Sequence, residues 1–503
     1  MIMVAVDAKT VVPTPANEPV KSYAPGSPER AALEAKLAEF AAADPVEITG
    51  VFGAERRPGG GDVLEVRMPS DRAHVLGVVH QASHEDAEAA IAGAMKAAPD
   101  WAALPFEERA AVFLRAADLI AGPYRAALNA ATMLGQGKTV QQAEIDAACE
   151  LIDFLRFNVA YAERIYADQP ASSPGVWNRM EYRPLEGFVY AITPFNFTAI
   201  AGNLPTSAAL MGNPVVWKPA LTQSFAAQQF LDILELAGLP RGVINMVPGH
   251  GKMISDIALN SPHLAGIHFT GSTGVFQGLW GQVGANIATY RGYPRIVGET
   301  GGKDFVVAHP SADPAALVTA LVRGAYEYSG QKCSAASRTY IAKSVWNKIR
   351  DELIGQIEAL KVGDVRDLSN FTSAVIDDRA FRKLSGVIDT CRADPGMTIL
   401  AGGSYDDSEG WYIRPTLVQS DDPTADIFVT EYFGPLLGLY VYDDADYDRV
   451  LGLVDSASPY ALTGSVFATD RAAIAATMER LRFTAGNFYI NDKPTGAVVG
   501  QQP

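Results

Sequence analysis

The sequence predicts an α/β protein with two parallel-sheet domains. Beyond Gly187, short apolar segments alternate with helical segments, a pattern typical of parallel strands joined by crossover helices. A second alternation of the same kind begins after Arg295, so we expect two α/β domains joined near residue 297. The length of 503 residues also favours two or three domains over one.

The first part of the chain is predicted to be mainly helical. Residues 1–28 contain turn residues without periodicity and are predicted to form an arm, and an amphipathic helix is expected over residues 27–43. One or two strands are expected over residues 62–80. Ala-rich helices are then predicted over residues 85–98, 105–134 and 140–166.

Buried strands are predicted in both α/β domains. The first domain contains GFVYAI, PVVWKP, GVINMVPG and AGIHFTG, and the second contains RIVGETGG, DFVVAH and SRTYIA. In the second domain, helices are expected over residues 313–329 and 345–360. Ligands of open α/β sheets bind at the carboxyl ends of the strands. A common cleft should therefore be bordered by the loops after Ile192, Trp217, Met246 and Phe269.

Composition excludes several classes of protein. The net charge of −16 argues against a nucleic-acid partner, because such proteins present a basic surface. The three cysteines are far apart in sequence, so neither a disulfide framework nor a zinc site is expected. His80 and His84 lie where a helix begins and are better explained as a solvated helix end than as metal ligands, so no metal is predicted. The first thirty residues lack the pattern of a signal peptide, which favours a cytoplasmic protein.

One uncharged segment could be mistaken for a membrane span. No charged side chain occurs from Gly187 to Trp217. Prolines and asparagines interrupt this segment, and lipid would leave the broken backbone without hydrogen-bond partners. We therefore expect buried strand, helix and strand, with no membrane span.

A nucleotide site is indicated by the sheet but not by a standard fingerprint. No GxGxxG follows a strand, and GQGKT at 135–139 has Thr132 where a P-loop needs glycine, so both motifs are rejected. FTGSTG at 269–274 follows a strand and opens a helix, where it could hold a pyrophosphate or could simply be capped by Ser272 or Thr273. Lys218 ends an apolar strand and would point a cation toward the same edge.

Three residues could carry chemistry. Cys333 in SGQKCSAASR is either a nucleophile or an inert buried thiol, as expected for Cys149 and Cys391. Its pKa, about 8.5 for a free thiol, could be lowered by the adjacent Lys332 or by a helix terminus. Glu299, after an apolar strand and before two glycines, is a general base or a turn cap. Asn196 is an oxyanion donor or a turn residue.

Six motifs together resemble the aldehyde dehydrogenase family, in the family's order. They are TPFNF at 193–197, VVWKPA at 215–220, FTGST at 269–273, GETGG at 298–302, GQKCSA at 330–335 and EYFGP at 431–435. Within that superfamily, YEYSGQKCSAASR and AGNFYINDKPTGAVVGQQP are similar to segments of the delta-1-pyrroline-5-carboxylate dehydrogenases. The likeness spans residue 30 to the end.

The resemblance implies a role for each matching residue. Cys333 is implied to be the nucleophile, Glu299 the base that activates water, and Asn196 the side-chain half of the oxyanion hole. The implied cofactor is NAD. Its implied contacts are Thr193, Pro194, Lys218, Gly271, Ser272, Thr273, Gly274, Val275, Glu431 and Phe433. The implied pocket for the aldehyde contains Glu144, Phe197, Lys332 and Ser334.

The implied reaction is oxidation of L-glutamate γ-semialdehyde to L-glutamate through a thiohemiacetal and a thioester of Cys333, in proline catabolism. Leu221 stands where many superfamily members have a carboxylate that binds the adenosine ribose, so NAD rather than NADP rests on the narrower family. Three alternatives are a different semialdehyde dehydrogenase, such as one for succinate semialdehyde, a thiol esterase, and a catalytically silent binding protein.

The resemblance also implies a domain plan. An NAD-binding domain is expected over residues 29–166 and 188–296, and a catalytic domain over residues 297–483. An oligomerisation element is expected from a β-hairpin at 167–187 together with residues 484–503, where its C-terminal part is expected to be incomplete. A homodimer or larger homo-oligomer is implied, and an encounter with a proline dehydrogenase is a further implied partner.

Overall fold

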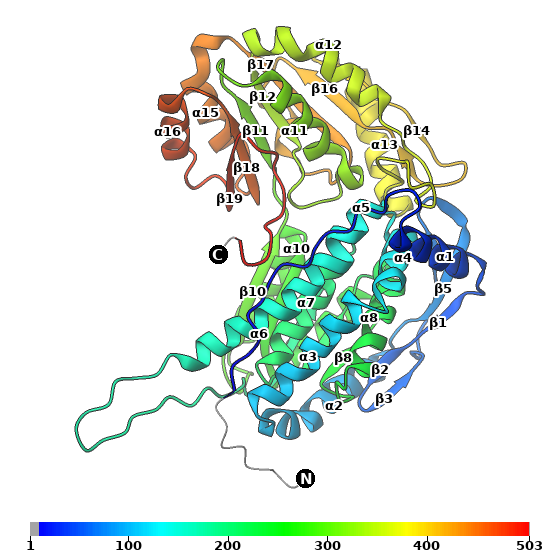
Figure 1. Ribbon diagram of the computed structural model, residues 1–503, viewed down its shortest axis with the longest axis vertical. Helices are drawn as coiled ribbons and strands as arrows, with labels where there is room; N and C mark the ends of the chain where they lie inside the picture. The colour runs from blue at the N-terminus through cyan, green and yellow to red at the C-terminus, as the bar shows by residue number, and fades with distance from the viewer. Residues whose placement is uncertain (1–9, 502–503) are drawn as a thin grey trace.

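The computed structural model describes residues 10–501 and contains two α/β domains, one above the other in the view of Figure 1. The predicted fold class is confirmed. The lower domain has a five-stranded sheet with every strand pair parallel, in the order β10-β9-β6-β7-β8. Its strands are β6 (Phe188–Ile192), β7 (Val215–Lys218), β8 (Ile244–Met246), β9 (Leu264–Gly271) and β10 (Arg295–Thr300).

Helices connect these parallel strands, so the carboxyl ends of all five lie at one edge of the sheet, as the sequence predicts. The connecting helices are α7 (Thr198–Leu210), the 3₁₀ turn η2 (Leu221–Gln223), α8 (Ser224–Leu236), α9 (Gly251–Asn260) and α10 (Thr273–Ala285). The uncharged segment forms β6, α7 and β7, as expected. Within residues 10–501, no helix combines the length and apolarity that a bilayer crossing requires.

The N-terminal part of the lower domain is a helical layer beside a small sheet. The small sheet has the order β1-β5-β4, with β1 (Val46–Ile48), β4 (Val63–Met68) and β5 (Asp71–His80), and a separate hairpin joins β2 (Gly50–Phe52) to β3 (Glu55–Arg57). The helices are α1 (Pro28–Ala42), α2 (His84–Ala103), α3 (Phe106–Ala121), α4 (Arg125–Gln136), α5 (Val140–Ala143), a π-helical turn η1 (Glu144–Glu150) and α6 (Leu151–Ala167).

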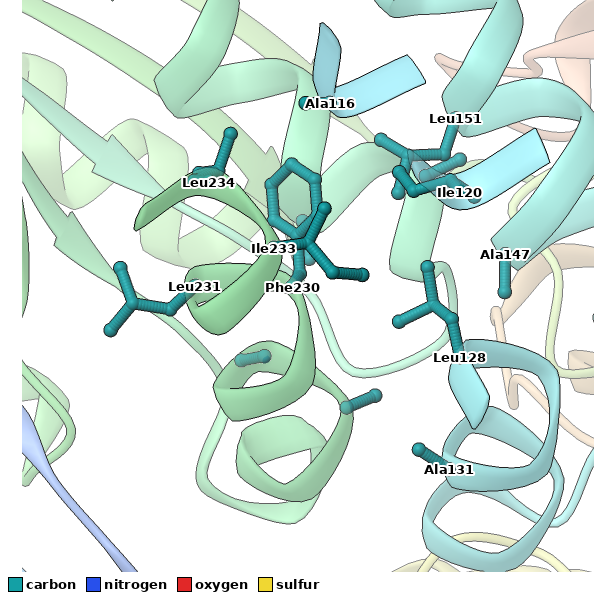
Figure 2. Close-up of a cluster of buried hydrophobic side chains, with 14 of the residues drawn as sticks. Ala116, Ile120, Leu128, Ala131, Ala147, Leu151, Phe230, Leu231, Ile233 and Leu234 are labelled. Atoms are coloured by element: carbon teal, nitrogen blue, oxygen red, sulfur yellow. The ribbon is translucent and has the colours of Figure 1, made fainter. Parts of the chain in front are cut away.

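The predicted helix over residues 105–134 is wrong in its continuity. It divides at Gly122 and Pro123, because glycine ends α3 and proline lacks the N–H that a continuing helix would use. The break lets α3 and α4 pack separately against α8. Figure 2 shows the resulting cluster of buried apolar side chains, including Ile120, Leu128 and Phe230.

The upper domain has a seven-stranded sheet in the order β13-β16-β17-β12-β11-β18-β19, in which only the β13–β16 pair is antiparallel. Its strands are β11 (Phe305–Ala308), β12 (Arg338–Ala342), β13 (Met397–Ala401), β16 (Thr416–Ser420), β17 (Leu436–Tyr442), β18 (Thr463–Phe467) and β19 (Asn487–Ile490), with a small hairpin of β14 (Tyr405–Asp406) and β15 (Tyr412–Ile413). Its helices are α11 (Pro314–Tyr326), η3 (Glu327–Gly330), α12 (Lys343–Ala359), α13 (Asp378–Ala393), α14 (Asp426–Val429), η4 (Asp444–Asp446), α15 (Tyr447–Ser456) and α16 (Arg471–Arg480).

The predicted helix over residues 313–329 ends early, at Tyr326. Three consecutive residues, Tyr328, Ser329 and Gly330, have φ values of 53°, 51° and 64°. Left-handed backbone cannot continue a right-handed helix, so the chain turns sharply just before Cys333.

Two predicted domain limits need correction. Strand β10 runs through the predicted boundary at 296/297 and pairs with β9 along its whole length, so the change of sheet falls between Thr300 and Phe305. Residues 487–490 form β19 and pair with β18 in the upper sheet, although they were expected in the oligomerisation element.

The segment over residues 168–187 projects from the lower domain as a long narrow loop (Figure 1). The expected β-hairpin is wrong in detail, because this segment contains no strand. Its two limbs are joined instead by side-chain bonds, such as the one from the Met180 N–H to Gln169 Oε1 at 2.8 Å. At the tip, Trp177 is 89% exposed.

The predicted arm lies along the helical layer in an extended conformation (Figure 1). Residues 1–9 of the arm and residues 502–503 at the chain end lie outside the described residues. The arm is held by hydrogen bonds from the Val12 N–H to Glu163 and from the Glu18 N–H to Asp153. The chain end returns to the same place, because the Asn17 amide donates to the Val499 carbonyl at 2.7 Å.

Candidate active site

Asn196 and Cys333 are brought together where the two domains meet. Asn196 lies in the bend between β6 and α7, and its buried amide Nδ2 donates a hydrogen bond to the Gln331 carbonyl at 3.0 Å. Gln331 is two residues before Cys333 in the loop between η3 and β12. The predicted oxyanion donor and the predicted nucleophile therefore lie side by side, although 137 positions separate them in sequence.

The Cys333 thiol has a raised pKa. Burial is the largest cause, and the carboxylates of Glu299, Asp304, Glu150 and Glu431 raise the pKa further. The possibility that the surroundings lower this pKa is therefore wrong for the structure as it stands. The residue as a whole is half-buried.

Lys332 does not offset these carboxylates because it is paired elsewhere. Its ammonium lies 3.0 Å from Glu327. Burial alone would raise the pKa of Glu327, but Lys332, Lys493 and Arg323 together lower it to about 2. The predicted contact of Lys332 with the substrate stays a prediction. To make that contact, the Lys332 ammonium would have to bind the substrate and Glu327 at the same time.

Glu299 stands near the end of β10, where its side chain is exposed at the surface, and partial desolvation by its neighbours raises its pKa. It is the charge with the greatest effect on the Cys333 thiol, so the two groups share one site. Glu431 reaches the turn that follows Glu299, because a Cβ on Gly301 would lie only 2.2 Å from the Glu431 carboxylate. Glycine is required there for the carboxylate to approach the backbone.

An aromatic pair joins the two predicted cofactor motifs. The rings of Phe195 and Phe433 are 5.8 Å apart and meet edge to face. Phe433 has φ 59°, an uncommon conformation for a bulky residue, so the EYFGP segment is held firmly in a strained form. Motifs at 193–197 and 431–435 thus border the same place.

The other predicted cofactor residues lie at the carboxyl edge of the lower sheet. Lys218 ends β7, forms no ion pair with any residue in 10–501, and has its pKa lowered to about 8 by burial. Thr193 accepts a hydrogen bond from Trp217 Nε1 at 3.0 Å, which fixes its hydroxyl. Pro194 lies between Thr193 and the Asn196 bend.

The turn between β9 and α10 has open backbone donors. Gly271 ends β9, and Ser272 precedes α10 without a side-chain cap, so the first N–H groups of α10 are open. The first turn of α10 contains Thr273, Gly274 and Val275.

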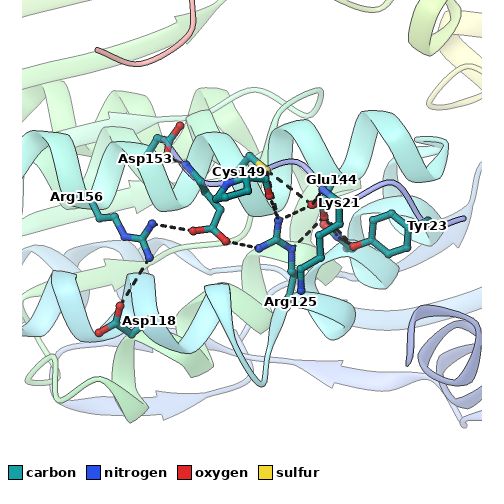
Figure 3. A network of polar contacts seen from close by, with 11 residues as sticks. Lys21, Tyr23, Asp118, Arg125, Glu144, Cys149, Asp153 and Arg156 are labelled. Carbon is teal, nitrogen blue, oxygen red and sulfur yellow. Dashed lines mark hydrogen bonds and ion pairs between the residues drawn. The ribbon is translucent and has the colours of Figure 1, made fainter. Parts of the chain in front are cut away.

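The structure places Glu144 outside the predicted substrate pocket. This carboxylate is fully buried and pairs with Arg125, and it accepts bonds from the Tyr23 hydroxyl at 2.7 Å and the Lys21 N–H at 2.8 Å (Figure 3). Burial would raise its pKa, but these partners lower it. Glu144 therefore anchors the N-terminal arm. The sequence could not show this, because its partners in the arm, Lys21 and Tyr23, lie more than 100 positions away.

Phe197 and Ser334 remain candidates for the substrate pocket. Phe197 is half-buried beside Asn196, with the Lys138 ammonium 3.8 Å from its ring centroid. Ser334 is buried, and its carbonyl accepts a bond from the Thr463 hydroxyl at 3.3 Å. Both follow a predicted catalytic residue directly.

Three ionisable residues near Cys333 were missed. Burial, and then Asp146, raise the pKa of Glu150 to about 8, while burial raises that of Asp304 to about 8 and lowers that of Lys303 to about 7. Lys303 helps to line a cavity of about 20 Å³ with Lys332 and Glu431. One signal existed in the sequence: Lys303 and Asp304 are charged residues directly before an apolar strand that had to be buried.

Comparison with known proteins agrees with this geometry. A model of the aldehyde dehydrogenase family matches residues 57–503. A protein of Schizosaccharomyces pombe named probable delta-1-pyrroline-5-carboxylate dehydrogenase is 49% identical over 501 residues, covering 99% of this chain and 91% of the relative. The human mitochondrial protein of that name is 46% identical, covering 97% of this chain and 86% of the relative.

Solved structures give the same result. The Delta-pyrroline-5-carboxylate dehydrogenase of Mycobacterium tuberculosis, in a crystal structure described as bound with NAD, superposes with a TM-score of 0.96 at 59% identity, covering 99% of this chain and 92% of that one. From the family match, these identities and the shared fold, we conclude that the chain belongs to the aldehyde dehydrogenase family.

Proposed function

We propose that this chain catalyses the NAD-dependent oxidation of L-glutamate γ-semialdehyde, the hydrolysis product of 1-pyrroline-5-carboxylate, to L-glutamate. One observation carries the proposal: the Asn196 amide is held 3.0 Å from the Gln331 carbonyl, two residues from Cys333. Relatives at 46% to 59% identity that cover nearly the whole chain are named for this substrate.

The residues at the carboxyl edge of the lower sheet fit an anionic dinucleotide. Lys218 forms no ion pair within residues 10–501. Its ammonium lies 3.6 Å from the position that a Cβ on Gly251 would occupy. The open N-terminus of α10 adds backbone donors and the positive end of a helix dipole. Lys218 and the 271–275 turn would hold the ribose and pyrophosphate, and Glu431 and Phe433 would hold the nicotinamide end. When bound, NAD supplies the hydride acceptor.

The residues around Cys333 can perform the covalent steps. The Cys333 thiol gives its proton to solvent, the resulting thiolate sulfur adds to the aldehyde carbon, and the electron pair of the broken carbonyl π bond moves to the oxygen, which becomes an oxyanion. Asparagine has two N–H donors on its amide, and only one is used by the Gln331 carbonyl, so the other can stabilise the oxyanion together with the Cys333 N–H. Loss of hydride leaves a thioester on Cys333.

Glu299 then completes the cycle. Its carboxylate takes a proton from water, the water oxygen adds to the thioester carbon, and collapse of the adduct releases glutamate and the Cys333 sulfur. A carboxylate whose pKa is raised by desolvation is a stronger base than one with an ordinary pKa, which suits this role.

The test is absorbance at 340 nm with the purified chain, 1-pyrroline-5-carboxylate and either NAD or NADP, with succinate semialdehyde in parallel. We expect NADH formation with 1-pyrroline-5-carboxylate and NAD. Preference for succinate semialdehyde would reassign the substrate, and ester hydrolysis without cofactor as the only activity would favour the thiol esterase.

The wider setting is part of the same proposal. We infer a homodimer or larger homo-oligomer and a cytoplasmic location, although several relatives are named as mitochondrial. An encounter with a proline dehydrogenase stays a proposal. It is supported by structural similarity at 29% identity to half of proline utilization A from Bdellovibrio bacteriovorus.

A further inference from the structure

A buried ion pair lies behind the candidate active site and has no part in the reaction described above. Lys138, the lysine of the GQGKT segment, is fully buried, and its ammonium lies 2.7 Å from the Asp146 carboxylate. The desolvation of two charges is expensive, and such pairs often stabilise a protein less than apolar residues would. Stability alone therefore does not account for the pair.

Asp146 fixes the start of α7. Its two oxygens accept hydrogen bonds from the N–H groups of Thr198, at 3.0 Å, and Ala199, at 2.8 Å. The residue before α7, Phe197, offers no side-chain cap. Asp146 thus caps this helix from another element, η1, and holds the bend that carries Asn196.

Lys138 contacts one aromatic ring from each of the two segments that carry the predicted oxyanion donors. Its ammonium is 3.8 Å from the ring centroid of Phe197 and 4.7 Å from that of Tyr328. Phe197 is next to Asn196. Tyr328 begins the left-handed turn that leads to Cys333, and its hydroxyl donates to the Gln136 carbonyl at 2.9 Å.

We propose that Lys138 and Asp146 form a positioning pair, which sets the distance between the Asn196 amide and the Cys333 N–H and so tunes the oxyanion hole. Asp146 holds the Asn196 side, and Lys138 spans the gap to the Cys333 side. Neither group touches the reacting atoms. The inference deepens the proposed function and rests on it.

The test replaces Asp146 with Asn, which keeps the shape and removes the charge. We expect Asp146→Asn to slow the first-turnover burst of NADH at least about tenfold, since loss of one oxyanion donor costs about a hundredfold to a thousandfold. The Kd for NAD should stay within about twofold of wild type, because the cofactor edge is untouched. Stopped-flow absorbance and NAD titration give the two values.

A double-mutant cycle separates positioning from simple loss of stability. In an Asn196→Ala background there is no amide to position, so adding Asp146→Asn should slow the burst by less than about twofold. A fully additive effect would overturn the inference. The matched control is Asp153→Asn, because Asp153 is also a buried carboxylate that accepts a backbone N–H, yet it holds the arm. This control should lower Tm and leave the burst rate unchanged.

A second variant and a second substrate complete the test. If Asp146→Asn does not fold, Lys138→Met combined with Asp146→Asn removes both members of the ion pair and is expected to show the same slow burst. All variants are also assayed with propanal. If the wild type turns over propanal but not 1-pyrroline-5-carboxylate, the proposed substrate is rejected. The burst rates of the variants with propanal then still test whether Lys138 and Asp146 position the oxyanion donors. A wild-type burst rate in the folded variants would reject the pair.

Discussion

At the scale of single residues, Cys333 decides whether the chain is an enzyme. Cys333→Ala removes the sulfur that is proposed to hold the substrate covalently, so dehydrogenase activity should vanish while NAD binding remains within about twofold. Absorbance at 340 nm and an NAD titration measure the two effects. Turnover by this variant at more than a trace of the wild-type rate would remove Cys333 from the mechanism.

The thiol of Cys333 should also respond unusually to pH. Its pKa is raised by burial and by nearby carboxylates, so the thiolate forms only at higher pH than in an ordinary cysteine. In the enzyme without NAD, the rate of alkylation by iodoacetamide should still be rising at about pH 9.5, where a thiol of pKa about 8.5 has levelled off. A midpoint at or below that ordinary pKa would contradict the burial of the thiol.

Lys218 should make the binding of NAD depend on pH. Binding should weaken as pH rises, whereas alkylation of Cys333 becomes faster. Burial lowers the pKa of Lys218 to about 8, so the ammonium that is proposed to attract NAD is present below pH 8 and lost above it. The Kd for NAD should rise by up to about tenfold between about pH 7 and pH 9. Lys218→Ala should bind NAD more weakly at both pH values, without this pH dependence. An equal pH dependence in the variant would assign it to another group.

The residues of the site divide by what a sequence can reveal. That Cys333, Glu299 and Asn196 lie near one another could be predicted because they stand in specific motifs beside strand ends, and their catalytic roles stay predictions. Glu144 could not, because only folding shows that Arg125 and the arm surround its carboxylate. The raised pKa of Cys333 was missed for the same reason: Lys332 is adjacent in sequence, yet in space it pairs with Glu327.

At the scale of elements, the left-handed turn at residues 328–330 is the most demanding feature. A Cβ at Gly330 would lie 2.3 Å from the Gly434 carbonyl, in addition to the strain at φ 64°. Gly330→Ala should therefore lower the free energy of unfolding by at least about 2 kcal/mol and reduce activity. Gly355→Ala, in an exposed position on α12 with open space around it, is the control and should stabilise the protein by about 1 kcal/mol. Urea unfolding measures both. An equal change in the free energy of unfolding in the Gly330 and Gly355 variants would show that the turn at residues 328–330 can relax.

Most elements, but not their ends, follow from sequence patterns. The alternation beyond Gly187 predicts the parallel strands correctly, because buried strands are short and apolar. Helix ends were predicted less well at two places. The helix that ends at Tyr326 is ended by tertiary structure, and the helix that ends at Ala121 is ended by a single Gly-Pro step. The hairpin at 168–187 has no strand because its limbs bond through side chains rather than through a backbone ladder.

At the scale of the whole molecule, the projecting loop should govern assembly. Trp177 at its tip is 89% exposed, and an isolated apolar projection of this kind is expected to pack against another copy. Replacing residues 172–180 with a short Gly-Ser turn should convert a dimer or larger assembly into monomers, as measured by analytical ultracentrifugation. Unchanged sedimentation would place the interface elsewhere.

The separation of the two sheets also sets an order of events during synthesis. The lower sheet is complete once Thr300 has left the ribosome, whereas the upper sheet waits for Ile490 at the end of β19. At about 5–20 residues per second, that interval lasts roughly 10–40 s. The half of the site that fits the cofactor can therefore form first. For most of the interval Cys333 is already made but not yet buried, so the newborn chain passes through a period in which its most important thiol is open to oxidants and to other chains.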